Sequence, residues 1–310
     1  MKLNIADKVR ATAESQGPPG RAWLSSVSDI VAELATNWRL TLGGQRSGGT
    51  ASVVVDVTTS AGELAVLKVA VPGIDPTNAA FRVLRAANGR GYARVFRADH
   101  TREAMLLERL GSQLAETDLS ADEQISVICA SLAAAWGPLP AGETFMAGAE
   151  KARALGRLID GVWADFDRPC AEKTVDVART YAELRERAFD PSTAVMAHGD
   201  AHAWNLLADP NKPGSFKFVD PDGVFVERAY DLSISLRELS QETLAGDLVA
   251  PAHRRCRQLA ALSGVAIEPI WQWGLIERTA NGLLWLRQGR PELAREFLVA
   301  ADAWAAAGPP

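Results

Sequence analysis

The stretch VMAHGDAHAWNLL, Val195–Leu207, places two histidines, an aspartate and an asparagine within eight residues, between two apolar runs. Inside a buried strand such a cluster would be unfavourable, because a desolvated polar group without a partner costs about 1–3 kcal/mol. A surface loop rarely has hydrophobic residues on both sides. We therefore interpret His198 to Asn205 as part of a functional site.

The cluster lies directly before a predicted β-hairpin. Residues 205–220, NLLADPNKPGSFKFVD, have the pattern strand, turn, strand, and a second polar cluster, VDPDG, ends the hairpin. Because a hairpin brings its two ends together, Asn205 and Asp220 are predicted to be neighbours. Their oxygen atoms suit Mg²⁺, which keeps several waters and needs few protein ligands. Asp200, on the preceding loop, is placed to accept a proton from an alcohol, as phosphoryl transfer requires.

The chain before Leu110 predicts a sheet with one or two helices beside it. Ser52–Val57 and Leu64–Val69 are separated by TTSAG, which is typical of a β-hairpin. A second strand pair is predicted within residues 92–100 and 104–110, after a short helix near residues 76–88. Apolar residues at helical spacing predict an earlier helix that ends near Trp38.

After Leu110 the pattern is mostly helical. Helices are predicted within residues 119–136, 150–166, 175–189 and 267–286, and Ser120 with Glu123 form a capping box before the first of them. In the third helix, we expect one stripe to face the core: Val177, Tyr181, Leu184 and Ala188. We assign these apolar stripes to packing and give them no function.

Composition excludes several classes of function. The 310 residues are 47% hydrophobic and 23% charged, as in a globular protein, and the net charge of −5 argues against a nucleic-acid partner. No run of eighteen apolar residues predicts a membrane span, and the N-terminus lacks the apolar run of a signal peptide. The three scattered cysteines, Cys129, Cys170 and Cys256, fit neither a metal site nor a disulfide framework, so we expect a reducing cytoplasm.

Several motifs, in order along the chain, resemble a known family. HGDAHAWN is similar to the catalytic loop of aminoglycoside phosphotransferases, FVDPDG to their metal-binding segment, and RAYDLS to the segment that follows. GRAWLSSVSDIVAELATNWRL, GGTASVVVDV, AVLKVA, NGRGYARVF and AMLLERL resemble, more closely, the streptomycin 6-phosphotransferase and hydroxyurea-resistance kinase group. The resemblance runs from about Gly20 to Asp231.

The resemblance implies an α+β, protein-kinase-like fold of two lobes, with ATP between them and Mg²⁺ as cofactor. Residues 1–110 would form a small antiparallel β-sheet lobe that binds the nucleotide, with a hinge near residues 108–111. Residues 111–310 would form a larger, mostly helical lobe with the catalytic loop and the acceptor site.

The resemblance also assigns roles to individual residues. Asp200 would be the catalytic base, with Asn205 and Asp220 as magnesium ligands. The expected nucleotide contacts are Lys68 on its strand, Ser47, Gly48, Gly49 and Thr50 in a loop over the phosphates, and the backbone of the hinge from Glu108 to Leu110. The residues expected to brace the catalytic loop are His198, His202 and Asp231.

Some features depart from the pattern or leave alternatives open. Kinase-like folds pair the strand lysine with a glutamate on the next helix, but residues 74–88 contain no glutamate, so Asp75 or Glu103 would have to replace it. Asp222 is expected either to contact a second metal ion or to be solvated. A zinc site built on His198 and His202 is excluded, because no third ligand follows at zinc spacing.

The sequence thus predicts an ATP- and Mg²⁺-dependent O-phosphotransferase whose acceptor is a hydroxyl group of a cationic, streptomycin-like aminoglycoside, an antibiotic-resistance activity. Two alternatives stay open: a kinase of another small metabolite (an amino sugar, a fructosamine or a hydroxyurea-like compound), or a nucleotide-binding protein with little catalysis. Acidic residues of the helical lobe would receive a cationic acceptor. Glu277 is a candidate, although a solvated surface position is the simpler expectation for it.

Overall fold

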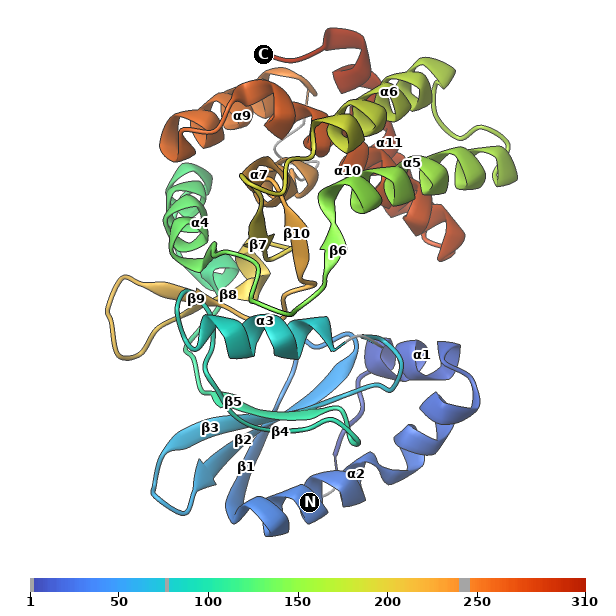
Figure 1. Cartoon of the computed structure of the whole chain (residues 1–310). Coiled ribbons are helices and arrows are strands. Elements are labelled where there is room, and N and C mark those ends of the chain that lie inside the picture. Colours follow the sequence, from blue (N-terminus) through green and yellow to red (C-terminus); the bar gives the residue numbers. More distant parts are fainter. Residues whose placement is uncertain (1–2, 76–77, 240–245) are drawn as a thin grey trace. The chain divides into compact units, whose positions relative to one another are not determined.

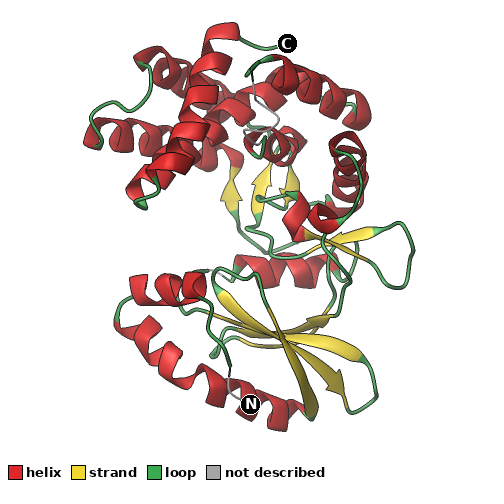
Figure 2. Cartoon of the chain, turned by 180° about the vertical axis from the view of Figure 1, so that it is seen from behind, coloured by secondary structure: helices red, strands yellow, loops and turns green. Residues whose placement is uncertain are grey.

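The computed structural model describes residues 3–75, 78–239 and 246–310, and the chain divides into two compact units. The N-terminal unit comprises Met1–Gly111 with Asp209–Pro213, and the C-terminal unit comprises Ser112–Ala208 with Gly214–Pro310. The first unit combines a sheet with helices, and helices dominate the second unit (Figures 1 and 2). The predicted α+β class is therefore confirmed.

A five-stranded antiparallel sheet forms the centre of the N-terminal unit, in the order β1-β2-β3-β5-β4. Its strands are β1 (Leu40–Arg46), β2 (Ser52–Thr59), β3 (Leu64–Ala70), β4 (Val95–Asp99) and β5 (Ala104–Glu108). The hairpin predicted between β2 and β3 is confirmed, with Val54 opposite Lys68. The second strand pair is confirmed as β4 and β5.

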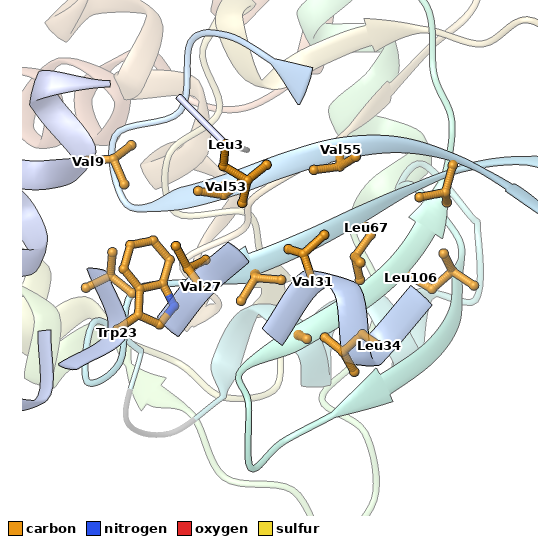
Figure 3. Close-up of a cluster of buried hydrophobic side chains, with 14 of the residues drawn as sticks. Leu3, Val9, Trp23, Val27, Val31, Leu34, Val53, Val55, Leu67 and Leu106 are labelled. Atoms are coloured by element: carbon orange, nitrogen blue, oxygen red, sulfur yellow. The ribbon is translucent and has the colours of Figure 1, made fainter. Parts of the chain in front are cut away.

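Helix α2 (Pro18–Trp38) covers one face of this sheet and makes the core of the unit. Trp23, Val27, Val31 and Leu34 follow one another at helical spacing and point toward the strands (Figure 3). Alternate residues of the strands, such as Val55, meet them, and all of these side chains are buried. The period of about 3.6 in the helix and of 2 in the strands is what brings the two apolar faces together.

Two shorter helices complete the N-terminal unit: α1 (Asp7–Ser15) and α3 (Ala79–Ala87). The predicted helix near residues 76–88 is confirmed as α3. Both carboxylate oxygens of Asp75 accept hydrogen bonds from the first turn of α3: the backbone N–H groups of Ala79 and Ala80 donate them, each at 2.9 Å. This caps the helix, because the first N–H groups of a helix have no partner inside it.

The C-terminal unit is built from helices around α10 (Ile267–Arg287), which packs against α5, α6, α7, α9 and α11. The surrounding helices are α4 (Ala121–Ala135), α5 (Gly148–Asp165), α6 (Glu172–Ala188), α7 (Arg228–Arg237), α9 (Ala250–Ser263) and α11 (Pro291–Ala307). The predicted capping box is confirmed, since Ser120 and Glu123 bond each other's backbone N–H group at the start of α4. Among the helices of the described residues, none combines the length and apolarity that a bilayer crossing needs.

The predicted core stripe of α6 is wrong. The buried residues of this helix are Thr174, Val175, Ala178 and Ala182, whereas Leu184 is 37% exposed. The helix packs its small side chains inward because α5 approaches closely: a Cβ on Gly156 of α5 would lie 3.5 Å from the Cβ of Ala182. The close approach of α5 thus favours small residues over larger apolar ones on the inward face of α6.

Two small sheets position the loops of the C-terminal unit. β6 (Met146–Ala147), β10 (Val224–Val226) and β7 (Val195–Ala197) form one, in that order. The other is the predicted hairpin, confirmed as β8 (Leu206–Ala208) and β9 (Phe216–Phe218). Residues 198–205 connect β7 to β8, and residues 219–223 connect β9 to β10. Both polar clusters of the sequence therefore lie between the same pair of sheets.

Candidate active site

The turn at Gly199 determines how the catalytic loop leaves β7. Gly199 has φ +91°, and a Cβ at this position would lie 2.8 Å from the Cβ of Asp222. The carbonyl oxygen of His198 accepts hydrogen bonds from the N–H groups of Asp222 (2.8 Å) and Gly223 (3.1 Å). Only glycine fits this conformation and this close approach, so the two polar clusters lie against each other.

Asp231, in the first turn of α7, holds the same turn from the other side. Its Oδ2 accepts hydrogen bonds from the N–H of His198 and from the indole Nε1 of Trp136, both at 2.9 Å. Its Oδ1 accepts a hydrogen bond from the N–H of Gly199 at 2.8 Å. The side chain is fully buried. A buried carboxylate is stable here because its oxygens meet three donors.

His198 connects the catalytic loop to the hairpin. Its Nδ1 accepts a hydrogen bond from the N–H of Asp200 at 3.1 Å, so its Nε2 carries the proton and donates to the carbonyl of Val219 at 2.8 Å. The ring is buried and lies 4.7 Å from the ring of Phe218. With both ring nitrogens bonded to the backbone, His198 braces the loop.

The carboxylate of Asp200 is held by two side chains. Oδ1 lies 2.5 Å from Nη2 of Arg237, and Oδ2 lies 3.1 Å from Nε2 of His202. Burial alone would raise the pKa of Asp200, but the hydrogen bond from His202 and the charges of Arg237 and His202 outweigh it, so this pKa lies well below its usual value. Asp200 is therefore ionised, and its carboxylate is oriented by Arg237 and His202.

Asn205 and Asp220 lie at adjoining ends of the hairpin. The N–H of Val219, the residue before Asp220, donates to the carbonyl of Asn205 at 2.9 Å. The side-chain Nδ2 of Asn205 donates to the carbonyl of Asp200 at 3.0 Å, which leaves its Oδ1 as the atom for a metal. The backbone of Asp220 is in the left-handed region, with φ +56°.

The oxygen donors near this hairpin fit Mg²⁺ better than zinc. An amide oxygen and a carboxylate are hard ligands, and Mg²⁺ completes its octahedron with waters and phosphate oxygens. Within the described part of the chain, no three His, Cys, Asp or Glu side chains are grouped so that they could hold a metal ion by themselves. Asp222 is partly accessible to solvent, but the surrounding protein desolvates its carboxyl group, and this desolvation, followed by the charge of Asp200, raises its pKa.

The expected phosphate contacts belong to the N-terminal unit. Lys68 lies on β3 between Val54 of β2 and Met105 of β5. Ser47 to Thr50 join β1 to β2. Within this loop Gly48 has φ +105°, and a Cβ on Gly49 would lie 2.9 Å from the carbonyl oxygen of Ser52. The two glycines thus permit a backbone conformation that other residues would disturb.

The two carboxylates expected near Lys68 have backbone partners. Asp75 caps α3, as described above. Oε1 of Glu103 accepts a hydrogen bond from the N–H of Gly73 at 3.1 Å, and Glu103 itself has φ +47°. Both residues therefore shape the connection between β3 and α3.

Some backbone groups of the predicted hinge, Glu108 to Leu110, already form hydrogen bonds within the N-terminal unit. The N–H of Glu108 donates to the carbonyl of Arg94 at 2.8 Å, and Oε2 of Glu108 accepts from the N–H of Arg94. The carbonyl of Leu110 accepts from Nη2 of Arg46 at 3.4 Å. An adenine ring would have to use other backbone groups of the hinge, such as those of Arg109, or displace these bonds.

The sequence analysis did not consider two side chains that shape the site, Trp136 and Arg237, and it named Glu277 as a candidate to receive a cationic acceptor but expected it to be solvated. Glu277 is 2% exposed and accepts a hydrogen bond from the hydroxyl of Tyr230 at 2.6 Å. A single arginine near a helix end, or a tryptophan after a helix, gives no signal of its own in a sequence. Only their contacts with Asp200 and Asp231, across 37 and 95 residues, reveal their role.

Comparison with known proteins gives a family and a fold. Residues 37–289 match the family model described as aminoglycoside/hydroxyurea antibiotic resistance kinase. The chain is 29% identical to the streptomycin 6-kinase of Streptomyces glaucescens over 277 residues, which are 88% of this chain and 87% of that protein. It is 30% identical to the hydroxyurea phosphotransferase of Kitasatospora aureofaciens over 242 residues, which are 73% of this chain and 66% of that protein.

Solved structures support the fold. The macrolide 2′-phosphotransferase from Brachybacterium faecium is similar with a TM-score of 0.57 and 17% sequence identity, over 87% of this chain and 98% of that one. Identity this low shows a common fold and nothing more specific. The predicted kinase-like fold is confirmed.

Proposed function

The chain belongs to the aminoglycoside/hydroxyurea antibiotic resistance kinase family, and from this premise we propose that it transfers the γ-phosphoryl group of ATP to a hydroxyl group of a cationic, streptomycin-like aminoglycoside, with Mg²⁺ as cofactor. It is a phosphotransferase, and the family places its acceptor oxygen on a hydroxyl group. The donor, the metal ion and the identity of the acceptor are the parts that we propose.

The arrangement of Asp200 is the observation that carries this proposal. Its carboxylate is ionised, is held at both oxygens by Arg237 and His202, and lies beside the amide of Asn205. A kinase needs this combination, a fixed proton acceptor next to an oxygen ligand for the metal. A protein that only binds nucleotide has no need to hold Asp200 in this way.

In this scheme each residue has a positional task. Asp200 orients the acceptor hydroxyl group and receives its proton as the new oxygen–phosphorus bond forms and the bond to the leaving ADP breaks. Asn205 and Asp220 would hold Mg²⁺, which supplies charge neutralisation of the phosphate oxygens. Lys68 and the loop from Ser47 to Thr50 would bind the phosphates from the N-terminal unit.

Two features favour a cationic acceptor. The chain has a net charge of −5, and three carboxylates, Asp200, Glu238 and Asp222, lie on or next to the catalytic machinery. Trp204 adds an aromatic surface: it lies between His202 and Asn205, and its side chain is 54% exposed. Carboxylates and an exposed indole are the groups that attract guanidinium and ammonium ions.

The acceptor can be identified by mass. The protein would be incubated with ATP, MgCl₂ and a panel of streptomycin, other aminoglycosides, amino sugars and neutral polyols, and each compound inspected for a phosphate adduct. We expect adducts on streptomycin-like compounds, loss of turnover with EDTA, and a strongly reduced response to Mg²⁺ in the Asp220→Ala variant. Nucleotide binding without any adduct would instead support the non-catalytic alternative.

Hydroxyurea is a second candidate acceptor, because the sequence identity to the hydroxyurea phosphotransferase is as high as that to the streptomycin kinase, over a shorter alignment. Hydroxyurea is small and uncharged, so its binding would depend neither on the negative charge of the site nor on the indole of Trp204. Including hydroxyurea in the panel distinguishes it from streptomycin-like acceptors.

We also propose that the reaction takes place in the cytoplasm, because Cys129, Cys170 and Cys256 are free thiols.

A further inference from the structure

Arg237, the last residue of α7, carries a guanidinium group that faces three carboxylates. Its Nη2 lies 2.5 Å from Oδ1 of Asp200, its Nε 2.8 Å from Oε1 of Glu238, and its Nη1 3.7 Å from Oε2 of Glu277. The side chain is 12% exposed. Because the guanidinium group is planar and rigid, three partners in different directions fix its orientation.

Glu277 holds Arg237 from the interior of the unit. Oε1 of Glu277 accepts a hydrogen bond from the hydroxyl of Tyr230 at 2.6 Å and lies 3.9 Å from Nζ of Lys151. Oε2 accepts one from Nδ2 of Asn281 at 3.0 Å. The carboxylate that faces Arg237 is thus itself oriented by three side chains from α5, α7 and α10.

Helix α10, which carries Glu277, also fixes the main chain of Arg237. Nη1 of Arg278, the residue after Glu277 on α10, donates to the carbonyls of Arg237 (3.0 Å) and Leu239 (3.2 Å). The guanidinium group of Arg278 lies 4.8 Å from the ring of Trp304, and burial lowers its pKa to about 10. Helix α10 therefore determines where both the backbone and the side chain of Arg237 lie.

Stability alone does not explain this arrangement. A buried ion pair contributes little compared with apolar side chains of the same size, because taking the charges out of water offsets their attraction. The C-terminal unit also contains a similar pair with no contact to the catalytic loop: Nη1 of Arg185 lies 3.1 Å from Oε2 of Glu227. Arg185 faces one carboxylate, whereas Arg237 faces three, and one of these three belongs to Asp200.

We propose that Arg237 is a positioning residue of the phosphotransfer reaction, which holds the Asp200 carboxylate in the orientation that meets the acceptor hydroxyl group, and that Glu277 fixes Arg237 for this purpose. The inference rests on the proposed function, since it gives Asp200 its role. The proposal follows from the geometry: Arg237 binds one oxygen of Asp200, His202 binds the other, and Asn205 binds its carbonyl.

The test compares Arg237→Ala with Arg185→Ala as the matched control. We expect Arg237→Ala to lower kcat about 10²-fold, the loss typical of a misplaced catalytic group, with the KM for the acceptor and the Kd for ATP little changed. Guanidinium chloride at low concentration should restore part of kcat in Arg237→Ala, and urea, which has the same shape without the charge, should not. Arg185→Ala should change the melting temperature but not kcat.

In Arg237→Ala, the buried carboxylate of Glu277 no longer faces a guanidinium group. The double variant Arg237→Ala/Glu277→Gln removes the charge of that carboxylate as well. We expect it to recover melting temperature relative to Arg237→Ala while kcat stays low. Recovery of kcat together with stability, or equal losses of kcat in Arg237→Ala and Arg185→Ala, would show that Arg237 only supports the fold and would overturn the proposal.

A crystal structure of Arg237→Ala tests the inference independently of the acceptor. We expect the Asp200 carboxylate to leave the rotamer that it has in the wild type, whereas an unchanged rotamer would overturn the proposal. If the wild type phosphorylates no compound of the panel, the proposed function fails, and this structural comparison still decides whether Arg237 orients Asp200.

Discussion

The catalytic loop (His198–Asn205) and the glycine-rich loop (Ser47–Thr50) are held in opposite ways. Charged side chains from distant parts of the chain fix the first: Asp231 and Arg237 bind it, and Trp136 in turn donates a hydrogen bond to Asp231. Backbone conformation shapes the second, through the positive φ of Gly48 and the close approach of Gly49 to the carbonyl of Ser52.

The difference suggests a division of labour. In the proposed function the catalytic loop presents one carboxylate in one orientation, and buried hydrogen bonds restrict the motion of that loop. The glycine-rich loop is expected to cover phosphates, which requires backbone N–H groups and little side-chain volume. Substitutions in the first loop should therefore act mainly on kcat, and substitutions in the second mainly on nucleotide binding.

The largest effect should come from Asp200→Asn. The amide cannot accept the proton of the acceptor hydroxyl group, so kcat should fall by about 10²–10⁴-fold. The Kd for ATP, measured by calorimetry in the presence of Mg²⁺, should barely change, because Asp200 is not expected to bind the nucleotide. Turnover that survives this substitution would remove Asp200 from the mechanism.

Asp231→Asn should have a combined effect on stability and kcat. One carboxylate oxygen of Asp231 becomes an NH₂ group, which faces a buried N–H donor and cannot accept its hydrogen bond. That donor is then unpaired, which costs about 1–3 kcal/mol of unfolding free energy. The shifted loop should also lower kcat about tenfold or more. Both would be measured, by urea denaturation and by steady-state kinetics.

Asp302→Ala is the control for Asp231. Oδ1 of Asp302 accepts hydrogen bonds from the N–H of Ala171 and the hydroxyl of Thr174 at the start of α6. Alanine removes this acceptor and leaves both donors unpaired, so the variant should also lose stability but should keep its kcat. Equal kcat losses in the two variants would mean that Asp231 acts through global stability, and the contrast between the loops would lose its main support.

The fold was largely predictable because its elements carry strong local patterns. The hairpin of β2 and β3, the helix that ends near Trp38 and the capping box at Ser120 were each predictable from neighbouring residues. The inward face of α6 was not. The larger apolar residues suggested Leu184, but the proximity of α5 selected Ala178 and Ala182, and that proximity is a tertiary property.

The candidate site was predictable to the same extent. The motif around Asp200 groups the acid, the amide and two histidines within eight residues, so the sequence could predict that they lie close together, while their catalytic roles stay predictions. Arg237 was not predicted, because its position follows from how α7 packs on α10, and Glu277 was named only as a candidate to receive a cationic acceptor. Helix α10 is buried on nearly every side, so the spacing of its apolar residues does not show whether Glu277 is buried or solvated.

A smaller effect, on nucleotide binding, is expected for Gly49→Ala. The added Cβ would lie 2.9 Å from the carbonyl oxygen of Ser52, so the loop must shift by a few tenths of an ångström. We expect the Kd for ATP to rise about fivefold, or roughly 1 kcal/mol, with kcat at saturating ATP little changed. Gly44→Ala on β1 is the control, because nothing lies within 4 Å of a Cβ there. Equal Kd values for the two variants would contradict a phosphate-binding role of this loop.

The smallest effect tests whether the rigid catalytic loop also recognises the acceptor. Trp204 has a fixed backbone, since its carbonyl accepts a hydrogen bond from Nε2 of Gln113 at 2.8 Å, and an exposed indole. A cation on an exposed aromatic face is worth about 0.5–1 kcal/mol. Trp204→Ala should therefore raise the KM for a cationic acceptor about two- to fivefold and leave that for a neutral acceptor unchanged. Trp204→Phe, which keeps a weaker aromatic face, should lie between wild type and Trp204→Ala. A KM that rises equally for cationic and neutral acceptors would assign Trp204 to loop packing, and the catalytic loop would then serve the reaction without selecting the substrate.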